Sequence, residues 1–365
     1  MKILKNEALK LHTSFRVGGP AKVYVVPEDI EELQKLIRFL YEEKLPYDII
    51  GNGTNLLVSD AGVDHVVVEI GRALEGIELL PEANASEATS SLRASSSSSE
   101  TVLKLADGSA DMCVSSDSTG TAAKTVDGSA KSASTEVDAM HTNAVKEQVN
   151  ATAADEKTYY VRVLAGTLLS KAAQFAATQE LAGMEALRGI PGTIGGAVTM
   201  NAGAYGTEMK DVLYSVDVLT PEGELRTLTP AELELGYRHS VIPERGYIVV
   251  AATLALRKGD PAEIQARMAD FQNRRKEKQP LDKASAGSTF KRPEGYFAGK
   301  LIEDTGLRGF RHGGAQVSEK HCGFVINDGT ARAADIYWLI GEVRKRVLLE
   351  QHVELTPEVK IWGEF

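Results

Sequence analysis

Two stretches of this sequence combine glycine with residues suited to holding an anion. Residues 189–206 read GIPGTIGGAVTMNAGAYG, and residues 51–60 read GNGTNLLVSD. Glycine lets a ligand approach the main chain closely, and bare backbone N–H groups form anion-binding concavities. A flexible linker is the alternative, but linkers are poor in Ile, Val, Met and Tyr. The composition of residues 189–206 therefore favours a phosphate-bearing cofactor held by the backbone.

The stretch at residues 51–60 does not carry the dinucleotide-binding fingerprint G-x-G-x-x-G, because Leu56 stands at the third glycine position. A Rossmann site is therefore not predicted here. Taken alone, Gly-Asn-Gly is also compatible with an ordinary tight turn.

Two further segments place polar side chains among apolar neighbours. Residues 236–240 (GYRHS) contain Arg238, and a guanidinium can bind a carboxylate through two parallel N–H bonds. Residues 285–293 (SAGSTFKRP) set Ser288 beside two cations. Considered singly, Arg238 would more often belong to a surface ion pair, and Ser288 would more often be a turn serine.

Strands and amphipathic helices must position these loops. The apolar patterns predict strands at 22–26, 47–50, 66–70, 159–165, 214–220, 224–228 and 247–257, and helices at 28–43, 168–178 and 331–349. A strand, a helix, a strand and then a Gly/Asn loop is the layout of an α/β unit with a ligand at the strand's end.

Another helix is predicted to begin at Asp260 and Pro261, with Glu263 three residues past the cap. Its far end carries Arg274, Arg275, Lys276 and Lys278. Most of these charges are interpreted as a solvated helix end, which suits the helix dipole. Lys278 differs, because Gln279-Pro280 fixes it close to the following loop.

The composition changes at about residues 81–157, which are rich in Ser, Ala, Thr and Asp and contain no aromatic residue. Such a segment buries too little apolar surface to fold, so we predict a mostly disordered insertion. The repeated DGSA lacks the alternating carboxylates and the distal Glu of a calcium loop. Cys113 and His141 stand alone, and no metal site is predicted.

The length, net charge, hydropathy and cysteine content of the chain argue against several classes of protein. The chain has 365 residues, enough for two or three domains, and a net charge of −10, which argues against a broad basic face for nucleic acid. No apolar run is long enough to cross a bilayer, and residues 1–10 have no signal-peptide core. The two cysteines fit a reducing compartment, so we expect a cytoplasmic protein without membrane insertion.

Seven segments together resemble the UDP-N-acetylenolpyruvoylglucosamine reductase family, flavoenzymes that complete UDP-N-acetylmuramate for peptidoglycan. GNGTNLLVSD, GIPGTIGGAVTMNAGAYG, GYRHS, KQP, SAGSTFKRP, AQVSEKH and LTPEV occur in the family's order. The resemblance covers the chain except for about residues 81–157. It implies an α+β chain, in which a two-subdomain, non-Rossmann FAD-binding fold like that of vanillyl-alcohol oxidase precedes a C-terminal α/β substrate domain.

The resemblance also implies a domain division. Residues 1–70 would form the first FAD-binding subdomain, joined by residues 354–365, and residues 71–259 the second subdomain, which contains the insertion. Residues 260–353 would bind the substrate. NADPH would be the reductant, UDP-N-acetylglucosamine enolpyruvate the substrate, and the protein a monomer.

Site residues follow from the resemblance, position by position. Contacts with FAD are expected at Gly51, Asn52, Gly53, Thr54, Asn55, Leu56, Gly189, Ile190, Pro191, Gly192, Thr193, Gly195, Gly196 and Asn201. Contacts with the substrate are expected at Tyr237, Lys278, Lys291, Arg292 and Gln316. Arg292 stands where relatives can carry Asn. His239 and His321 are expected to be structural.

The chemistry explains the three catalytic assignments. Hydride from the reduced flavin adds to the outer carbon of the enolpyruvyl group, so negative charge develops as an enolate and a proton must reach the adjacent carbon. The family implies Arg238 for the carboxylate, Glu358 for the enol and Ser288 as the proton donor. Fixed donors stabilise such charge, and a serine needs a neighbouring charge or relay to act as an acid.

Two other functions are alternatives to this reading. Another FAD-dependent oxidoreductase of the same fold, such as an alcohol oxidase, commonly links its flavin to a His or Cys, which neither glycine-rich loop contains. A non-catalytic sugar-nucleotide-binding protein would not need Arg238, Ser288 and Glu358 together.

Overall fold

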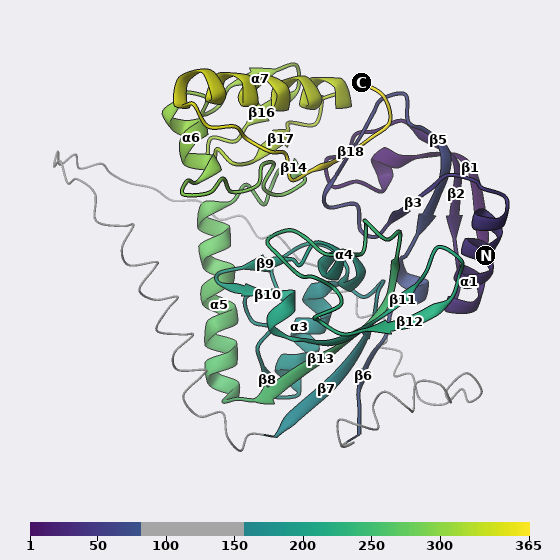
Figure 1. Ribbon diagram of the computed structural model, residues 1–365. Coiled ribbons are helices and arrows are strands. Elements are labelled where there is room, and N and C mark those ends of the chain that lie inside the picture. Colours follow the sequence, from purple (N-terminus) through teal and green to yellow (C-terminus); the bar gives the residue numbers. More distant parts are fainter. Residues whose placement is uncertain (82–156) are drawn as a thin grey trace, which may run out of the picture. The chain divides into compact units, whose positions relative to one another are not determined.

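The computed structural model describes residues 1–81 and 157–365 (Figure 1). The insertion predicted at about 81–157 therefore lies outside the described residues, apart from its two ends. No fold is assigned to it here.

The N-terminal part of the chain builds a four-stranded sheet in the order β1-β2-β5-β3. Its strands are β1 (Lys2–Ala8), β2 (Pro20–Val26), β3 (Tyr47–Ile50) and β5 (Val63–Glu69). β1 is antiparallel to β2, whereas β2, β5 and β3 run parallel. α1 (Ile30–Glu42) connects β2 to β3, and the Asp29 carboxylate caps it by accepting a hydrogen bond from the Glu32 N–H.

A second, antiparallel sheet has the order β12-β11-β13-β7-β6. Its strands are β6 (Ile77–Leu79), β7 (Thr158–Leu164), β11 (Leu213–Leu219), β12 (Leu225–Leu228) and β13 (Ile248–Lys258), and β8 (Leu181–Ala182) also pairs with β13. α3 (Leu169–Thr178) follows β7, and α4 (Ile194–Thr199) packs against β13. The hairpin of β9 (Gly203–Ala204) and β10 (Thr207–Glu208) comes next.

The C-terminal part contains a third sheet, in the order β14-β17-β16-β15. Its strands are β14 (Ala284–Ser285), β15 (Arg311–His312), β16 (Ala315–Val317) and β17 (Val325–Asn327). α6 (Ala298–Asp304) and α7 (Ala333–Gln351) pack with this sheet. The last strand, β18 (Lys360–Trp362), pairs in parallel with β4 (Leu56–Val58), directly after the first glycine-rich loop.

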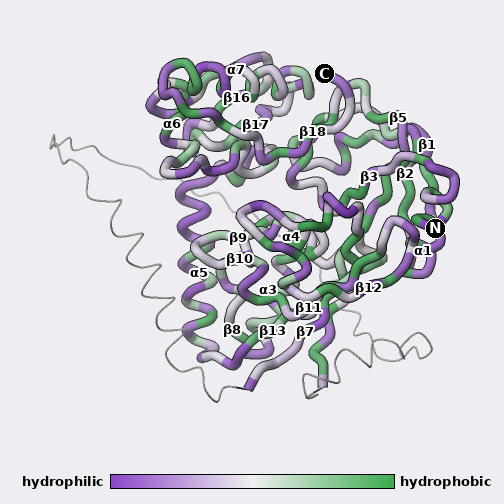
Figure 2. Tube along the Cα trace, viewed as in Figure 1, coloured by the Kyte–Doolittle hydropathy of each residue, from purple (hydrophilic) through white to green (hydrophobic). Residues whose placement is uncertain are grey.

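α5 (Pro261–Lys278) leads from β13 into the C-terminal part (Figure 1). The Asp260 carboxylate accepts hydrogen bonds from the backbone N–H groups of Ala262 and Glu263, as the sequence predicted. Figure 2 shows that α5 is mostly hydrophilic, and its buried side chains are Ile264, Met268 and Arg275. The burial of Arg275, only 4% exposed, corrects its interpretation as part of a solvated helix end.

The elements that the sequence did not predict include β1, β4, α4 and the β9–β10 hairpin. β1 is largely exposed, so it lacks the apolar pattern that marks a strand. β4 lies within the Gly/Asn loop predicted at residues 51–60. α4 and β9 lie inside the glycine-rich stretch at residues 189–206, and β10 directly follows it. The glycines of this stretch obscure the helical pattern, and the Thr193 hydroxyl caps α4 by accepting from the Gly196 N–H. The predicted strand at residues 47–50 is confirmed by β3.

Candidate active site

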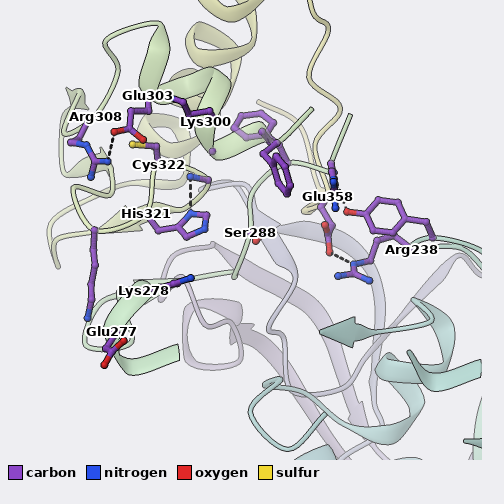
Figure 3. A pocket seen from close by; sticks show the side chains of 18 residues that line it. Arg238, Glu277, Lys278, Ser288, Lys300, Glu303, Arg308, His321, Cys322 and Glu358 are labelled. Carbon is purple, nitrogen blue, oxygen red and sulfur yellow. Dashed lines mark hydrogen bonds and ion pairs between the residues drawn. The ribbon is translucent and has the colours of Figure 1, made fainter. Parts of the chain in front are cut away.

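A cavity of about 470 Å³ lies between segments that are distant in the sequence (Figure 3). Ser288 lines this cavity and lies at the centre of the view. Five other residues predicted for substrate binding or catalysis also line it: Tyr237, Arg238, Lys278, Arg292 and Glu358. The structure therefore brings the three predicted catalytic residues to a single cavity.

Arg238 and Glu358 form an ion pair at one end of this cavity (Figure 3). The Arg238 Nε donates to Glu358 Oε1 at 2.8 Å, and its Nη2 donates to the Gly203 carbonyl at 3.1 Å. Arg238 has a φ of +53°, in the left-handed region, and its guanidinium lies 5.0 Å from the centre of the Tyr237 ring. These contacts fix the guanidinium through its Nε and Nη2 atoms.

The segments that carry Ser288 and Glu358 run side by side. The Glu358 N–H donates to the Thr289 carbonyl at 2.8 Å, and the Lys291 N–H donates to the Thr356 carbonyl at 2.9 Å. Burial raises the pKa of the Glu358 carboxyl, while the positive charges of Arg238 and Lys291 act to lower it. A carboxyl in this environment retains a proton to a higher pH than an exposed one.

The glycine-rich stretch at residues 189–206 is bonded to the turn that carries Arg238. The Asn201 amide donates to the Gly236 carbonyl at 2.8 Å, and the Ser240 hydroxyl donates to the Thr199 carbonyl at 2.7 Å. The Arg238–Gly203 bond is a third link. The position of the Arg238 guanidinium is therefore set by the same stretch that is expected to hold the cofactor.

The first glycine-rich loop is bonded in turn to the segment of Glu358. The Asn55 amide donates to the Glu358 carbonyl at 3.1 Å, and the Lys360 N–H donates to the Asn55 carbonyl at 3.0 Å. Each member of the ion pair is thus attached to a different glycine-rich loop.

The two loops also meet each other. The Thr54 hydroxyl donates to the Pro191 carbonyl at 3.3 Å, and a Cβ on Gly51 would lie 2.7 Å from the Thr193 hydroxyl. Gly53 has a φ of +57°, and a Cβ there would lie 1.8 Å from the His12 carbonyl. Two loops from different sheets thus form a surface of main chain, and these residues fit a cofactor whose phosphates are held by backbone groups.

Two of the residues expected to contact FAD also have contacts within the protein. Asn201 is completely buried, and its amide bonds Gly236, Glu208 and the Lys210 N–H. Gly189 packs against the guanidinium of Arg275. These contacts give both residues a reason to occupy their positions that does not require the cofactor.

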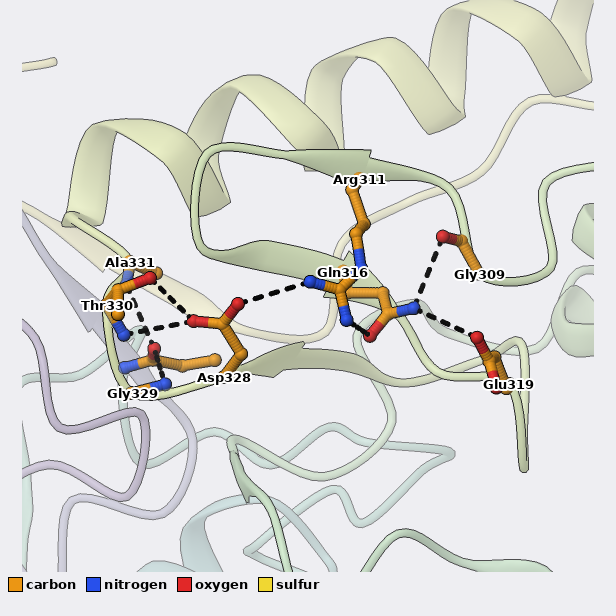
Figure 4. Close-up of polar contacts among 9 residues, drawn as sticks. Gly309, Arg311, Gln316, Glu319, Asp328, Gly329, Thr330 and Ala331 are labelled. Atoms are coloured by element: carbon orange, nitrogen blue, oxygen red, sulfur yellow. Dashed lines mark hydrogen bonds and ion pairs between the residues drawn. The ribbon is translucent and has the colours of Figure 1, made fainter.

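The expected substrate residues do not all reach the cavity. Arg292 lines it, with its guanidinium 4.0 Å from the centre of the Phe297 ring. Lys291 is outside the lining but affects Glu358 through its charge. Gln316 is buried away from the lining, where its amide joins Arg311, Gly309 and Glu319 (Figure 4).

Several residues at the other end of the cavity were not assigned from the sequence. They are Lys300, Glu303, Arg308, Lys320, His321 and Cys322. His321 Nδ1 accepts from the Gly323 N–H at 3.0 Å, so a neutral ring carries its proton on Nε2. Burial lowers the pKa of His321, and the charges of Arg308 and Lys278 add to this. His321 was expected to be structural, and the structure additionally places it in the wall of the cavity.

Two glycines, Gly299 and Gly323, make room for the His321 ring in the fold. A Cβ on Gly299 or on Gly323 would lie 3.2 or 2.9 Å from its ring. Both glycines therefore make room for this side chain, but the pairing of Gly299 with residue 321 is visible only in three dimensions.

The described residues contain neither a cluster suited to a metal ion nor a membrane-spanning helix. Residues 1–81 and 157–365 contain no group of three or more His, Cys, Asp or Glu side chains placed to hold a metal ion. Over the same ranges, no helix is long and apolar enough to span a membrane.

Known proteins match this chain along its length. The C-terminal domain of UDP-N-acetylenolpyruvoylglucosamine reductase matches residues 279–362, and a FAD-binding domain matches residues 21–94 and 132–229. The reductases of Agathobacter rectalis and of Caldanaerobacter subterraneus subsp. tengcongensis are 43% and 41% identical to it, over 100% of this chain and 95% and 94% of theirs.

A solved structure agrees. The crystal structure of UDP-N-acetylenolpyruvylglucosamine reductase from Thermus caldophilus superimposes with a TM-score of 0.66 at 31% identity, covering 99% of this chain and 98% of that one. The chain therefore contains a FAD-binding domain and belongs to the UDP-N-acetylenolpyruvoylglucosamine reductase family.

Proposed function

We propose that this protein reduces UDP-N-acetylglucosamine enolpyruvate to UDP-N-acetylmuramate in peptidoglycan precursor synthesis, with bound FAD and with NADPH as the reductant. One observation carries this proposal: Arg238, Ser288 and Glu358 line a single cavity, and the ion pair of Arg238 and Glu358 is attached to both glycine-rich loops.

Cofactor binding is assigned to the two loops that meet across the Thr54–Pro191 hydrogen bond. Residues 51–56 and 189–196 would hold FAD, with its phosphates on backbone N–H groups. When bound, FAD supplies the hydride for the reduction. NADPH supplies the reducing equivalents, and the binding of the substrate and the transfer of the proton are assigned to side chains of this chain.

Arg238 binds the carboxylate of the enolpyruvyl group. Its Nε and one Nη2 hydrogen are occupied by Glu358 and Gly203, which leaves Nη1 and the second Nη2 hydrogen as a two-pronged donor. As the reduction proceeds, charge on this carboxylate and the adjoining carbon increases. A fixed guanidinium in a partly buried site stabilises that charge without reorganising.

Glu358 supports the same centre. Its raised pKa lets it keep a proton to a higher pH than an exposed carboxyl, and the protonated form can donate a hydrogen bond where an ionised carboxylate would repel the substrate. The Arg238 charge opposes this shift, so substrate binding on Arg238 and proton retention on Glu358 are coupled. A substrate carboxylate that shares the guanidinium weakens its hold on Glu358 and promotes protonation.

Ser288 delivers the proton to the carbon next to the carboxylate. It is exposed to the cavity in the segment beside Glu358. The cations that line the cavity, Lys278 and Arg292 among them, favour the alkoxide-like character that a donating hydroxyl develops.

The remainder of the substrate is a nucleotide diphosphate sugar, which matches the cations of the cavity. We assign its binding to Tyr237, Lys278, Lys291 and Arg292. Gln316 acts indirectly, by supporting the cavity wall, because its amide is hydrogen-bonded to Arg311, Gly309 and Glu319.

We further propose that residues 260–353 form the substrate domain, and that residues 1–70 with 354–365 and residues 71–259 form the two FAD-binding subdomains. The protein is proposed to be a cytoplasmic monomer.

Anaerobic single-turnover reoxidation tests this function. The holoprotein is reduced with one equivalent of NADPH, and the flavin absorbance is followed after UDP-N-acetylglucosamine enolpyruvate is added. We expect the oxidised spectrum to return with stoichiometric formation of UDP-N-acetylmuramate. UDP-N-acetylglucosamine, which lacks the enolpyruvyl group, is the control and should leave the flavin reduced. Persistence of the reduced spectrum with both compounds would refute the proposal.

A further inference from the structure

Arg275 is a buried cation on α5 that takes no part in the chemistry above. Arg275 is 4% exposed, although the neighbouring Arg274 is partly exposed and pairs with Asp270. Burying a guanidinium is costly unless partners compensate, so its surroundings should reveal what it stabilises.

Those surroundings belong to the cofactor-binding stretch. The Arg275 Nη2 donates to the Ala186 carbonyl at 3.1 Å, and a Cβ built on Gly189 would lie 1.6 Å from Nη1. The guanidinium also lies 5.3 Å from the centre of the Tyr205 ring. Arg275 therefore contacts the segment before the glycine-rich stretch, its first residue and its last turn.

The backbone conformation at position 189 does not by itself require a glycine. Its φ is outside the left-handed region, so an alanine is conformationally allowed there. What excludes a side chain is the Arg275 guanidinium, with Nη1, the guanidinium carbon and Cδ all within 2.8 Å of the hypothetical Cβ.

The rest of α5 reinforces this contact. Arg267, two turns earlier, donates from Nη2 and Nε to Glu185 Oε1 at 2.8 and 3.2 Å. Phe271 stacks on the Tyr205 ring, with centroids 4.8 Å apart and an interplanar angle of 17°. α5 thus holds residues 185–189 and Tyr205 at three successive turns.

We propose that Arg275 is a positioning residue for FAD, which fixes the path of residues 186–189 and the Tyr205 turn so that the glycine-rich stretch is preformed for the cofactor. The inference rests on the FAD-binding role of this stretch and goes beyond the assignment of Gly189 as a direct contact. Gly189 is required because it accommodates Arg275.

The position of α5 gives this contact a second consequence. Lys278, one turn beyond Arg275, lines the cavity. The same helix thus carries Arg275, which contacts the cofactor-binding stretch, and Lys278, which lines the substrate cavity. A rigid element therefore fixes the position of the stretch relative to the cavity.

FAD titration of the apoprotein tests the proposal. Arg275→Met keeps the aliphatic bulk but removes the guanidinium, and it should raise the dissociation constant of FAD by at least about tenfold and reduce the increase in Tm that FAD confers. Arg274→Met is the matched control and should bind FAD like the wild type. A dissociation constant for Arg275→Met within about twofold of the wild-type value would overturn the proposal.

A double-mutant cycle separates positioning from general destabilisation. Gly189→Ala alone should weaken FAD binding at least about tenfold, whereas in an Arg275→Ala background the same change should cost less than about twofold. Equal costs in both backgrounds would show that Gly189 serves the cofactor directly and would overturn the proposal. If the Arg275 variants do not fold, Gly189→Ala decides the question. Weak FAD binding together with a lowered apoprotein Tm supports the proposal, because the alanine then disturbs the Arg275 contact in the absence of FAD. Wild-type affinity, or weak FAD binding with an unchanged apoprotein Tm, overturns it.

These measurements use neither the enolpyruvyl substrate nor NADPH. A wild-type protein that binds FAD but fails to reduce the substrate would refute the proposed function and leave the role of Arg275 intact.

Discussion

Arg238 and Glu358 are separated by 120 positions in the sequence, yet Arg238 Nε lies 2.8 Å from Glu358 Oε1. Each side chain is mostly buried, at 18% and 15% exposed. Gly203 and Asn55 attach the two partners to the two glycine-rich loops. A displacement of either loop is therefore transmitted to the ion pair, which couples cofactor binding to the geometry of the catalytic charges.

Replacing Ser288 by alanine tests the proton donor. Ser288→Ala should leave the NADPH-dependent bleaching of the flavin intact, because that step needs no proton on the substrate carbon. Reoxidation by the enolpyruvyl substrate should slow by about 10²- to 10⁴-fold, the usual contribution of a general acid. Stopped-flow absorbance separates the two half-reactions, and reoxidation at the wild-type rate would assign proton donation to another group.

Removing the Arg238 guanidinium tests charge stabilisation. Arg238→Met should lower kcat by about 10²- to 10³-fold, as the loss of a preorganised donor does in other enzymes. Arg238→Lys should recover little, since an ammonium cannot bond Glu358, Gly203 and a carboxylate in one plane.

Arg245→Met is the control for this series. Arg245 is exposed and pairs with Glu234 at 3.4 Å, outside the cavity lining. Steady-state kinetics should show no change for this variant. A loss equal to that of Arg238→Met would point to a general effect of charge removal.

The raised pKa of Glu358 predicts a pH-dependent stability. Between the ordinary carboxyl pKa of 4.5 and the raised value, the folded state keeps a proton that the unfolded state has lost. The folded state then binds more protons, so this contribution to the free energy of unfolding falls as pH rises through the window. It is complete below 4.5 and is lost above the raised pKa.

Glu358→Gln isolates this contribution, because glutamine does not titrate. Urea unfolding of both proteins from pH 5 to 8 should show the wild type losing free energy of unfolding relative to the variant as the pH rises. The variant lacks this titration at every pH, so its free energy of unfolding serves as the baseline. A difference that stays level or grows with pH would mean that Arg238 and Lys291 outweigh burial.

The sequence predicted the features that depend on local residue type. Glycine density located both loops, Asp260 and Pro261 marked the start of α5, and the seven ordered segments identified the family. These signals work because glycine, caps and motif spacing act within a few residues. The return of β18 to β4 was implied only by the resemblance.

Arg275 shows why the rest could not be predicted. A cation in the last turn of a helix is normally solvated, and nothing near it in the sequence indicates burial. Its burial depends on Ala186, Gly189 and Tyr205, which reach it only through the tertiary fold. The cavity wall at Arg308 and His321 could not be predicted for the same reason. It is formed by α6, the loop that follows α6 and the loop before β17, which come together only in the tertiary fold.

Asn201 distinguishes an anchoring amide from a flavin contact. The residue has a φ of +41°, so Asn201→Gly removes the amide without straining the backbone. If the amide anchors the Gly236 turn, its loss breaks the bonds to Gly236, Glu208 and the Lys210 N–H, and the apoprotein should lose about 2–3 kcal/mol of unfolding free energy. Chemical denaturation without FAD measures this directly. If apoprotein stability is unchanged while FAD affinity falls, the amide acts on the flavin itself, because only the bound cofactor could then account for the loss.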